Sequence, residues 1–229
     1  MMIESCKYMN ILNFEKYNEF YSLQNKLCYN PIKNCKSAGV IPYTIHNGKV
    51  LLLLHKLIDP IKKKDYGWND FGGKRNFNEN TIITAAREFS EETSCLFYLQ
   101  ELDDMKLYDS LKNNDKLIYS KNDIRNLKSI IPLSTKYFSE KINKYVSPIY
   151  INSKEIYISY LVKVNYLDVD DIPKAEDIHI PYENRYIRKC KWFTIDDLVK
   201  MDDNKFHKRL QITKIKERIH KFYNNDLLS

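Results

Sequence analysis

The sequence predicts an α/β sandwich built around one mixed β-sheet. Apolar side chains alternate through residues 155–165, which is typical of a β-strand. Two further strands are indicated at 39–45 and 50–54, with a Gly48-containing turn between them. Residues 80–94 have helical periodicity and follow a glycine-rich turn. Because strands flank a central helix in mixed order, we expect a single sheet covered by helices.

Residues 1–36 place aromatic and apolar side chains near helical spacing, so we expect a helical N-terminal extension. The main domain is expected over residues 37–202. Within it, residues 101–144 are charged, weakly periodic and without glycine clusters. We expect an inserted helical or loop segment there.

Strands are expected to resume after this insertion. The segments 147–151 and 155–165 are separated by a turn sequence at 152–154, and a further strand is expected near 186–193. In the long strand, alternate residues should form the buried face. These residues are Ile156, Ile158, Tyr160, Val162 and Val164.

Helices are expected to follow the last strand, one at 195–201 and one at about 205–223, the second within a C-terminal extension over 203–229. The second helix is basic. Its cationic residues are Lys205, Lys208, Arg209, Lys214, Lys216 and Arg218. A row of cations of this kind could follow the phosphate chain of an RNA.

Composition limits the functional classes. The 37 basic and 30 acidic residues give a net charge of +7, which favours polyanionic partners without identifying one. The five cysteines are odd in number and have no CxxC spacing, which argues against a disulfide framework or a zinc ribbon. No signal peptide is recognised, and the apolar run 50–54 is far shorter than the roughly 20 residues that cross a bilayer. We therefore expect a cytoplasmic protein without a membrane segment.

Three carboxylates are expected on one face of the helix at 80–94. Glu88, Glu91 and Glu92 are three and four residues apart, and this spacing brings side chains together on a helix. The opposite side is expected to carry Ile82, Ile83, Ala86 and Phe89. Clustered carboxylates suit Mg²⁺ or Mn²⁺. The alternative is a solvated helix face that is partly neutralised by Arg87.

The segment from Gly73 to Cys95 resembles the Nudix box, the loop–helix signature of the Nudix hydrolases. It matches in the first glycine, in Glu79, in Arg87 and in the three glutamates of the helix. It departs at Ser94, where the family usually has glycine. A left-handed backbone is expected at this helix exit, and serine there should cost on the order of 1 kcal/mol.

The resemblance continues on both sides of the box. The segment Trp68-Asn-Asp-Phe-Gly-Gly-Lys74 is similar to the one before the box in Nudix triphosphatases that remove oxidised purine nucleotides. Residues 191–198 resemble the last strand of the family where it enters the second helix. Together these segments imply a Nudix-type α/β/α sandwich over residues 37–202.

The resemblance also implies roles for individual residues. Glu88, Glu91 and Glu92 would be ligands of Mg²⁺ or Mn²⁺, and a salt bridge between Glu79 and Arg87 would orient them. Substrate contacts are expected from Trp68, Asn69, Gly72, Gly73 and Lys74. The family places its general base either in the box or on a separate loop. Glu176 and Asp177 are loop candidates, although an ordinary solvated loop is the simpler interpretation.

The implied function is hydrolysis of the diphosphate in a nucleoside diphosphate joined to another group, as in a nucleoside triphosphate or a dinucleotide. One alternative is removal of the mRNA 5′ cap, which the basic excess and the two extensions favour. A second alternative is an inactive Nudix-fold binding module, supported by Ser94 and by the insertion. Homodimers are frequent in the family, but nothing in the sequence specifies an interface.

Overall fold

The computed structural model describes residues 35–103, 105–112, 121–145, 148–151, 157–172, 187–212 and 215–224. The expected helical extension over 1–36 lies outside the described residues except for its last two. The loop candidates Glu176 and Asp177 and the expected turn at 152–154 also lie outside them.

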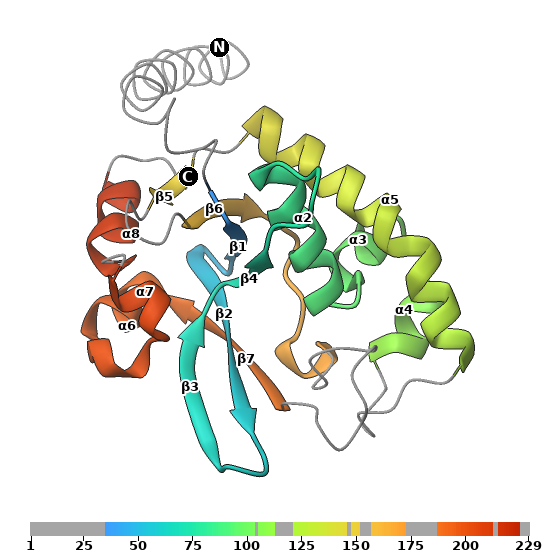
Figure 1. Ribbon diagram of the computed structural model, residues 1–229. Helices are drawn as coiled ribbons and strands as arrows, with labels where there is room; N and C mark the ends of the chain where they lie inside the picture. The colour runs from blue at the N-terminus through green and yellow to red at the C-terminus, as the bar shows by residue number, and fades with distance from the viewer. Residues whose placement is uncertain are drawn as a thin grey trace, which may run out of the picture.

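The described residues form a mixed β-sheet with the strand order β3-β2-β1-β6-β5, in which β4 also pairs with β1 and β7 with β2 (Figure 1). Strands β1 and β6 are parallel, and the other pairs are antiparallel. The mixed sheet predicted from the sequence is therefore confirmed. The strands are β1 Ser37–His46, β2 Lys49–Asp59, β3 Lys64–Asn69, β4 Phe71–Lys74, β5 Pro148–Ile151, β6 Tyr157–Lys163 and β7 Ile187–Thr194.

Helices cover the sheet on both sides, with α2 to α5 on one side and α6 to α8 on the other (Figure 1). The α-helices are α2 Thr81–Glu92, α3 Leu96–Glu101, α4 Met105–Lys112, α5 Lys121–Tyr145, α6 Ile195–Lys200, α7 Lys208–Ile212 and α8 Ile215–Asn224. Two short 3₁₀ helices are η2 Val169–Asp171 and η4 Asp203–Lys205. In the expected insertion, α4 and α5 account for most of the described residues, and α5 packs on α2. Among the described residues, no helix combines the length and apolar content that a bilayer crossing requires.

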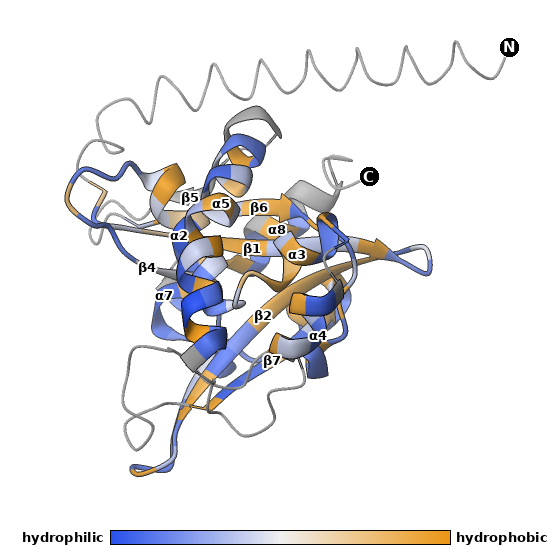
Figure 2. Cartoon of the chain, turned by 90° about the vertical axis from the view of Figure 1, so that its right-hand side faces the viewer, coloured by the Kyte–Doolittle hydropathy of each residue, from blue (hydrophilic) through white to orange (hydrophobic). Residues whose placement is uncertain are grey.

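Hydrophobic residues gather in the central strands, as Figure 2 shows for β1, β6 and much of β2. Of the residues predicted for the buried face of the long strand, Ile158, Tyr160, Val162 and Val164 are buried, and Ile156 lies outside the described residues, but the opposite face is buried as well. Tyr157, Ser159 and Leu161, on the opposite face of β6, have only 1–4% exposure. Both faces are covered because α2 and α5 pack on this strand while Tyr157 and Ser159 contact buried polar groups on its other side.

The prediction of a single helix at about 205–223 was wrong, because the chain is extended at Phe206 between η4 and α7. Phe206 forms a parallel bridge with Trp68, and the backbone N–H of His207 donates to the Trp68 carbonyl at 2.8 Å. Gly67, with φ +81°, allows this close approach. A Cβ at Gly67 would lie 2.7 Å from the Phe206 carbonyl carbon. The C-terminal segment 206–210 is thus fixed against β3.

Candidate functional site

The loop and helix of the predicted box are held in place by Arg87. Asn80 caps α2 by accepting a hydrogen bond from the Ile83 N–H at 2.9 Å. Arg87 lies one helical turn after Ile83. Its Nε and Nη2 donate to the two carboxylate oxygens of Glu79 at 2.7 and 3.1 Å. Nη2 also donates to the Lys74 carbonyl at 2.9 Å. The structure therefore contains the expected salt bridge, which connects the start of the loop to the helix.

Glu79 is an ionised partner of this arginine. Burial alone would raise the pKa of Glu79, but hydrogen bonds from Arg87 and from the Asn76 N–H outweigh it and lower the pKa below the ordinary value. The bidentate geometry is the strong form of an arginine–carboxylate pair.

Glu88 and Glu91 converge on one nitrogen atom of the same arginine. Arg87 Nη1 lies 2.9 Å from Glu88 Oε1 and 2.8 Å from Glu91 Oε2. The Glu88 carboxylate is pressed against Gly73, where a Cβ would come within 2.5 Å of it. Burial is the main cause that raises the pKa of Glu88, and Arg87 opposes it. Two of the three predicted ligands therefore share one partner, Arg87 Nη1, and one of these two, Glu88, lies against Gly73.

Glu92 is directed elsewhere. Its Oε1 accepts from Arg188 Nη2 at 3.1 Å, and its backbone carbonyl accepts from Arg188 Nη1 at 2.7 Å. Its Oε2 lies 3.9 Å from His55 Nε2. The three glutamates thus share one helix but do not converge on one point. Within the described part of the chain, no group of three His, Cys, Asp or Glu residues is arranged to hold a metal ion.

The donor set nevertheless fits a hard divalent cation, since all three side chains offer carboxylate oxygens. The Glu88 carboxylate occupies the space that a side chain at position 73 would need, so only glycine fits there. Arg87 Nη1 provides the positive charge that Glu88 and Glu91 share. This arrangement agrees with the alternative of neutralisation by Arg87 as well as with a metal site.

A buried polar network that the sequence did not reveal connects Glu92 with β4 and β6. Arg188 Nε donates to His55 Nδ1 at 3.1 Å, so the proton of this imidazole is on Nε2, which donates to the Asp70 carbonyl at 2.8 Å. Burial, followed by the charge of Arg188, lowers the pKa of His55 well below its ordinary value and keeps the ring neutral. The fully buried Asp70 carboxylate accepts from Tyr157 and Ser159 hydroxyls at 2.7 and 2.5 Å.

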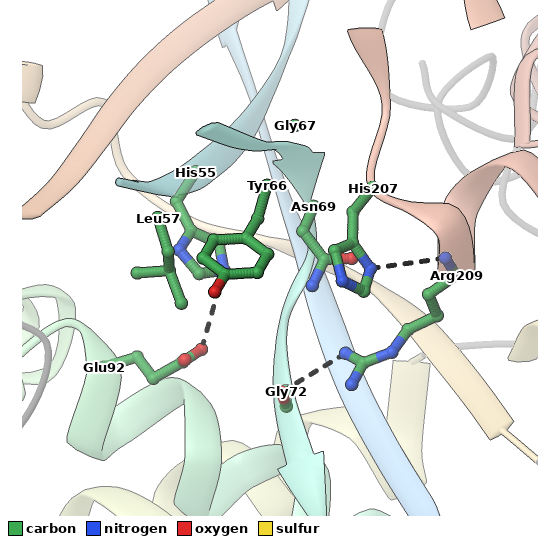
Figure 3. A pocket seen from close by; sticks show the side chains of 9 residues that line it. All are labelled: His55, Leu57, Tyr66, Gly67, Asn69, Gly72, Glu92, His207 and Arg209. Atoms are coloured by element: carbon green, nitrogen blue, oxygen red, sulfur yellow. Dashed lines mark hydrogen bonds and ion pairs between the residues drawn. The ribbon is translucent and has the colours of Figure 1, made fainter. Parts of the chain in front are cut away.

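A cavity of about 310 Å³ lies between this network and the C-terminal segment (Figure 3). Its volume is at the lower end of the range for small-molecule sites. The lining residues are His55, Leu57, Tyr66, Gly67, Asn69, Gly72, Glu92, His207 and Arg209. In Figure 3 the Tyr66 side chain points toward Glu92. The cavity therefore brings together one predicted metal ligand, two predicted substrate contacts and two residues from beyond residue 202.

The other predicted substrate contacts lie beside the cavity. The Trp68 ring packs edge-on against Phe193 at 4.8 Å, and this side chain is partly buried against the core. Gly73 contacts Glu88, and the Lys74 carbonyl accepts from Arg87. Only Asn69 and Gly72 of this set line the cavity.

The expected basic row on the C-terminal helix was also wrong in part. Arg209 turns into the cavity and contacts Tyr157 and Gly72. Lys216 donates to the Met201 carbonyl and pairs with Asp203. Lys205 is exposed, as is Lys208. The side chains of Lys214 and Arg218 lie outside the described residues.

The helix exit has the left-handed backbone that the sequence predicts. Ser94 has φ 49° and Cys95 has φ 59°, while the N–H groups of these residues donate to the Glu91 and Ser90 carbonyls. This is the Schellman pattern, which usually has glycine at the first left-handed position. Ser94 is also buried.

We expect Ser94→Gly to stabilise the protein by about 0.5–1 kcal/mol, because glycine has no Cβ to clash in this conformation. Thermal unfolding of the full chain measures the effect. Ser94→Ala is the control, since it removes the hydroxyl group and keeps the Cβ. A glycine variant less stable than the alanine variant would contradict the assignment of strain to this position.

Comparison with known proteins gives one close relative. The chain is 54% identical over 219 residues to the uncharacterized protein L534 of Acanthamoeba polyphaga mimivirus, covering 90% of this chain and 71% of that protein. No protein-family profile matches the chain.

Comparison with solved structures returns proteins of low identity. A C. elegans Ap4A hydrolase is 17% identical with a TM-score of 0.41, covering 82% of this chain and 96% of that one. The NUDIX domain of Shewanella oneidensis NrtR, complexed with ADP ribose, is 15% identical with a TM-score of 0.39, covering 82% and 86%. RenU, a Nudix hydrolase from M. smegmatis, is 11% identical with a TM-score of 0.37, covering 84% and 88%. Nudix proteins recur among the structural neighbours.

Proposed function

This chain belongs to one protein family with mimivirus protein L534, and we propose that it is a Nudix pyrophosphohydrolase that depends on a divalent metal ion. Its reaction is hydrolysis of the diphosphate in a nucleoside diphosphate joined to another group. The substrate class is a nucleoside triphosphate or a dinucleotide.

The observation that carries this proposal is the arrangement around Arg87. The bidentate pair with Glu79 fixes the arginine, the arginine contacts both Glu88 and Glu91, and Glu88 lies against Gly73. A solvated charged face has no need of a loop that is tied to the helix in this way. An ordered acidic cluster next to a side-chain-free backbone suits the binding of a metal ion together with a diphosphate.

Glu88, Glu91 and Glu92 are the residues that would hold the metal ion. When bound, the ion withdraws charge from the diphosphate and lowers the pKa of the attacking water. Arg87 and Glu79 keep the loop and helix in register. A carboxylate that is not itself bound to the metal ion must then accept the proton of the water.

The cavity beside Glu92 is the proposed site of the nucleotide. Asn69 offers a carboxamide, which can donate and accept hydrogen bonds. Its Oδ1 is buried, and among the described residues it has no hydrogen-bond partner. The rings of Tyr66 and His207 also line the cavity and provide flat surfaces for a base. Glu92 and Gly72 would then lie toward the phosphates.

The test is a hydrolysis screen with the full chain in Mg²⁺ or Mn²⁺. Substrates are nucleoside triphosphates, dinucleoside polyphosphates, nucleotide sugars and capped RNA, and mass spectrometry identifies the products. We expect a nucleotide product from a small substrate, and we expect none after chelation. Metal binding without product from any substrate would contradict the proposal and favour the inactive binding module, for which the divided carboxylates are the structural argument.

Cap removal is the second candidate. It is favoured by two exposed lysines near the cavity, Lys205 just before the C-terminal segment 206–210 and Lys208 within it. A decapping enzyme should require an RNA chain. Its activity should fall steeply with salt, because binding of lysine and arginine side chains to RNA phosphates releases counterions, and added salt opposes this release. Turnover of free nucleotides at the rate of capped RNA would exclude this candidate.

A further inference from the structure

Two residues of the C-terminal segment 206–210 enter the candidate site. Phe206 and Leu210 are buried, with 3% and 1% exposure, and anchor the segment in the core. Between them, His207 and Arg209 line the cavity. The backbone N–H of Arg209 donates to His207 Nδ1 at 3.2 Å, which fixes the imidazole ring against the segment (Figure 3). The segment is therefore a rigid wall of the cavity.

Arg209 reaches from this wall toward the glycine pair before the box. Its Nη1 donates to the Tyr157 hydroxyl at 3.1 Å, to the Gly72 carbonyl at 3.3 Å and to Asp70 Oδ1 at 3.4 Å. The guanidinium carbon lies 4.1 Å from the centre of the Tyr157 ring. Among the described residues, every hydrogen bond of this side chain leaves from Nη1. The Nε and Nη2 donors remain available for a ligand.

A purely structural role, as counterion of Asp70, explains this arrangement less well. Asp70 already accepts short hydrogen bonds from Tyr157 and Ser159, and its contact with Arg209 is the longest that the arginine makes. The Arg209 side chain is also 23% exposed, whereas that of Asp70 is fully buried. A guanidinium with two unused donors at a cavity wall is suited to bidentate binding of a phosphate.

The glycine pair separates this cation from the acidic cluster. Arg209 contacts the carbonyl of Gly72, and the Glu88 carboxylate rests on Gly73. We propose that Arg209 binds the diphosphate of the substrate from the side opposite the box, which makes the C-terminal segment part of the substrate site. This inference rests on the proposed function, because it assumes that a diphosphate lies over the glycine pair.

The test measures binding by isothermal titration calorimetry with the full chain in Mg²⁺. The probes are α,β-methylene-ADP, whose bridging carbon resists hydrolysis, and methylenediphosphonate, which has no base or sugar. We expect Arg209→Gln to weaken both probes by about 10- to 100-fold, the range for lost charge-assisted hydrogen bonds. Arg209→Lys keeps the charge beside Asp70 but loses the fork, so an intermediate loss is expected. Lys200→Gln removes an exposed charge from α6 and should leave both affinities unchanged.

Wild-type affinity of a folded Arg209→Gln variant would overturn the inference. If that variant does not fold, wild-type affinity of Arg209→Lys has the same meaning. A loss confined to the nucleotide probe would overturn the assignment to the diphosphate, as would wild-type protein that binds neither probe. Binding of both probes that depends on Arg209, without hydrolysis of any substrate in the screen, would contradict the proposed function and leave the inference standing.

Discussion

Replacement of Glu91 by glutamine is expected to abolish metal-dependent hydrolysis while the protein stays folded. Glu91 is the most exposed of the three box glutamates, at 40% side-chain exposure, and its ion pair with Arg87 is an ordinary pair one helical turn apart. Such a pair contributes about 0.3–0.5 kcal/mol. Loss of a metal ligand should instead lower kcat/KM by about 100-fold or more, in the range found when charge stabilisation of a transition state is removed.

Activity and thermal unfolding should be measured on the same preparation. Glu140→Gln is the matched control, since it removes an exposed carboxylate from α5 and should change neither quantity. Glu91→Gln with wild-type turnover would refute its assignment as a ligand. Glu92→Gln is a less selective test, because it also removes the carboxylate that faces the buried Arg188.

Replacement of Arg188 by methionine is expected to destabilise the protein by about 3–5 kcal/mol. The side chain of Arg188 is 1% exposed and that of Glu92 only 13%, so removal of the cation leaves a largely buried carboxylate without its ion pair. His55 Nδ1 would also lose a donor. The midpoint of thermal unfolding should fall by roughly 6–20 °C, given about 2–4 °C per kcal/mol in a chain of this size.

A double-mutant cycle isolates the ion pair. Arg188→Met combined with Glu92→Gln should be more stable than Arg188→Met alone, because the buried negative charge is then absent. Arg125→Met is the control on the exposed face of α5 and should have little effect. Additive losses in the double variant would show that the cost arises from packing rather than from the charge.

The parts of the site that the sequence predicts are those encoded by local spacing. Glu88, Glu91 and Glu92 lie on one helix, so their spacing alone places them near one another on it. The pair of Glu79 and Arg87 was implied by the resemblance to the Nudix box. The left-handed backbone at Ser94 was expected because the family usually has glycine at this helix exit. Ile83 is an exception. It was expected on the buried side of α2, but it is 37% exposed, and Thr84 and Ala85 are buried instead.

The rest of the site depends on contacts between distant segments. No local pattern shows that Arg188 of β7 meets Glu92, or that Arg209 meets Gly72. The break in the predicted C-terminal helix at Phe206 also depends on a tertiary contact. The sequence periodicity continues through this residue, but its pairing with Trp68 makes the backbone extended.

Gly67 and Phe206 are in contact, although they are synthesised at well-separated times during translation. Strands β1 to β4 and helix α2 emerge early and can begin to fold as the nascent chain lengthens. The wall that carries His207 and Arg209 can dock only after the chain has been synthesised through residue 210. If Arg209 binds the diphosphate as proposed, translation intermediates contain the acidic helix but lack the opposing cation.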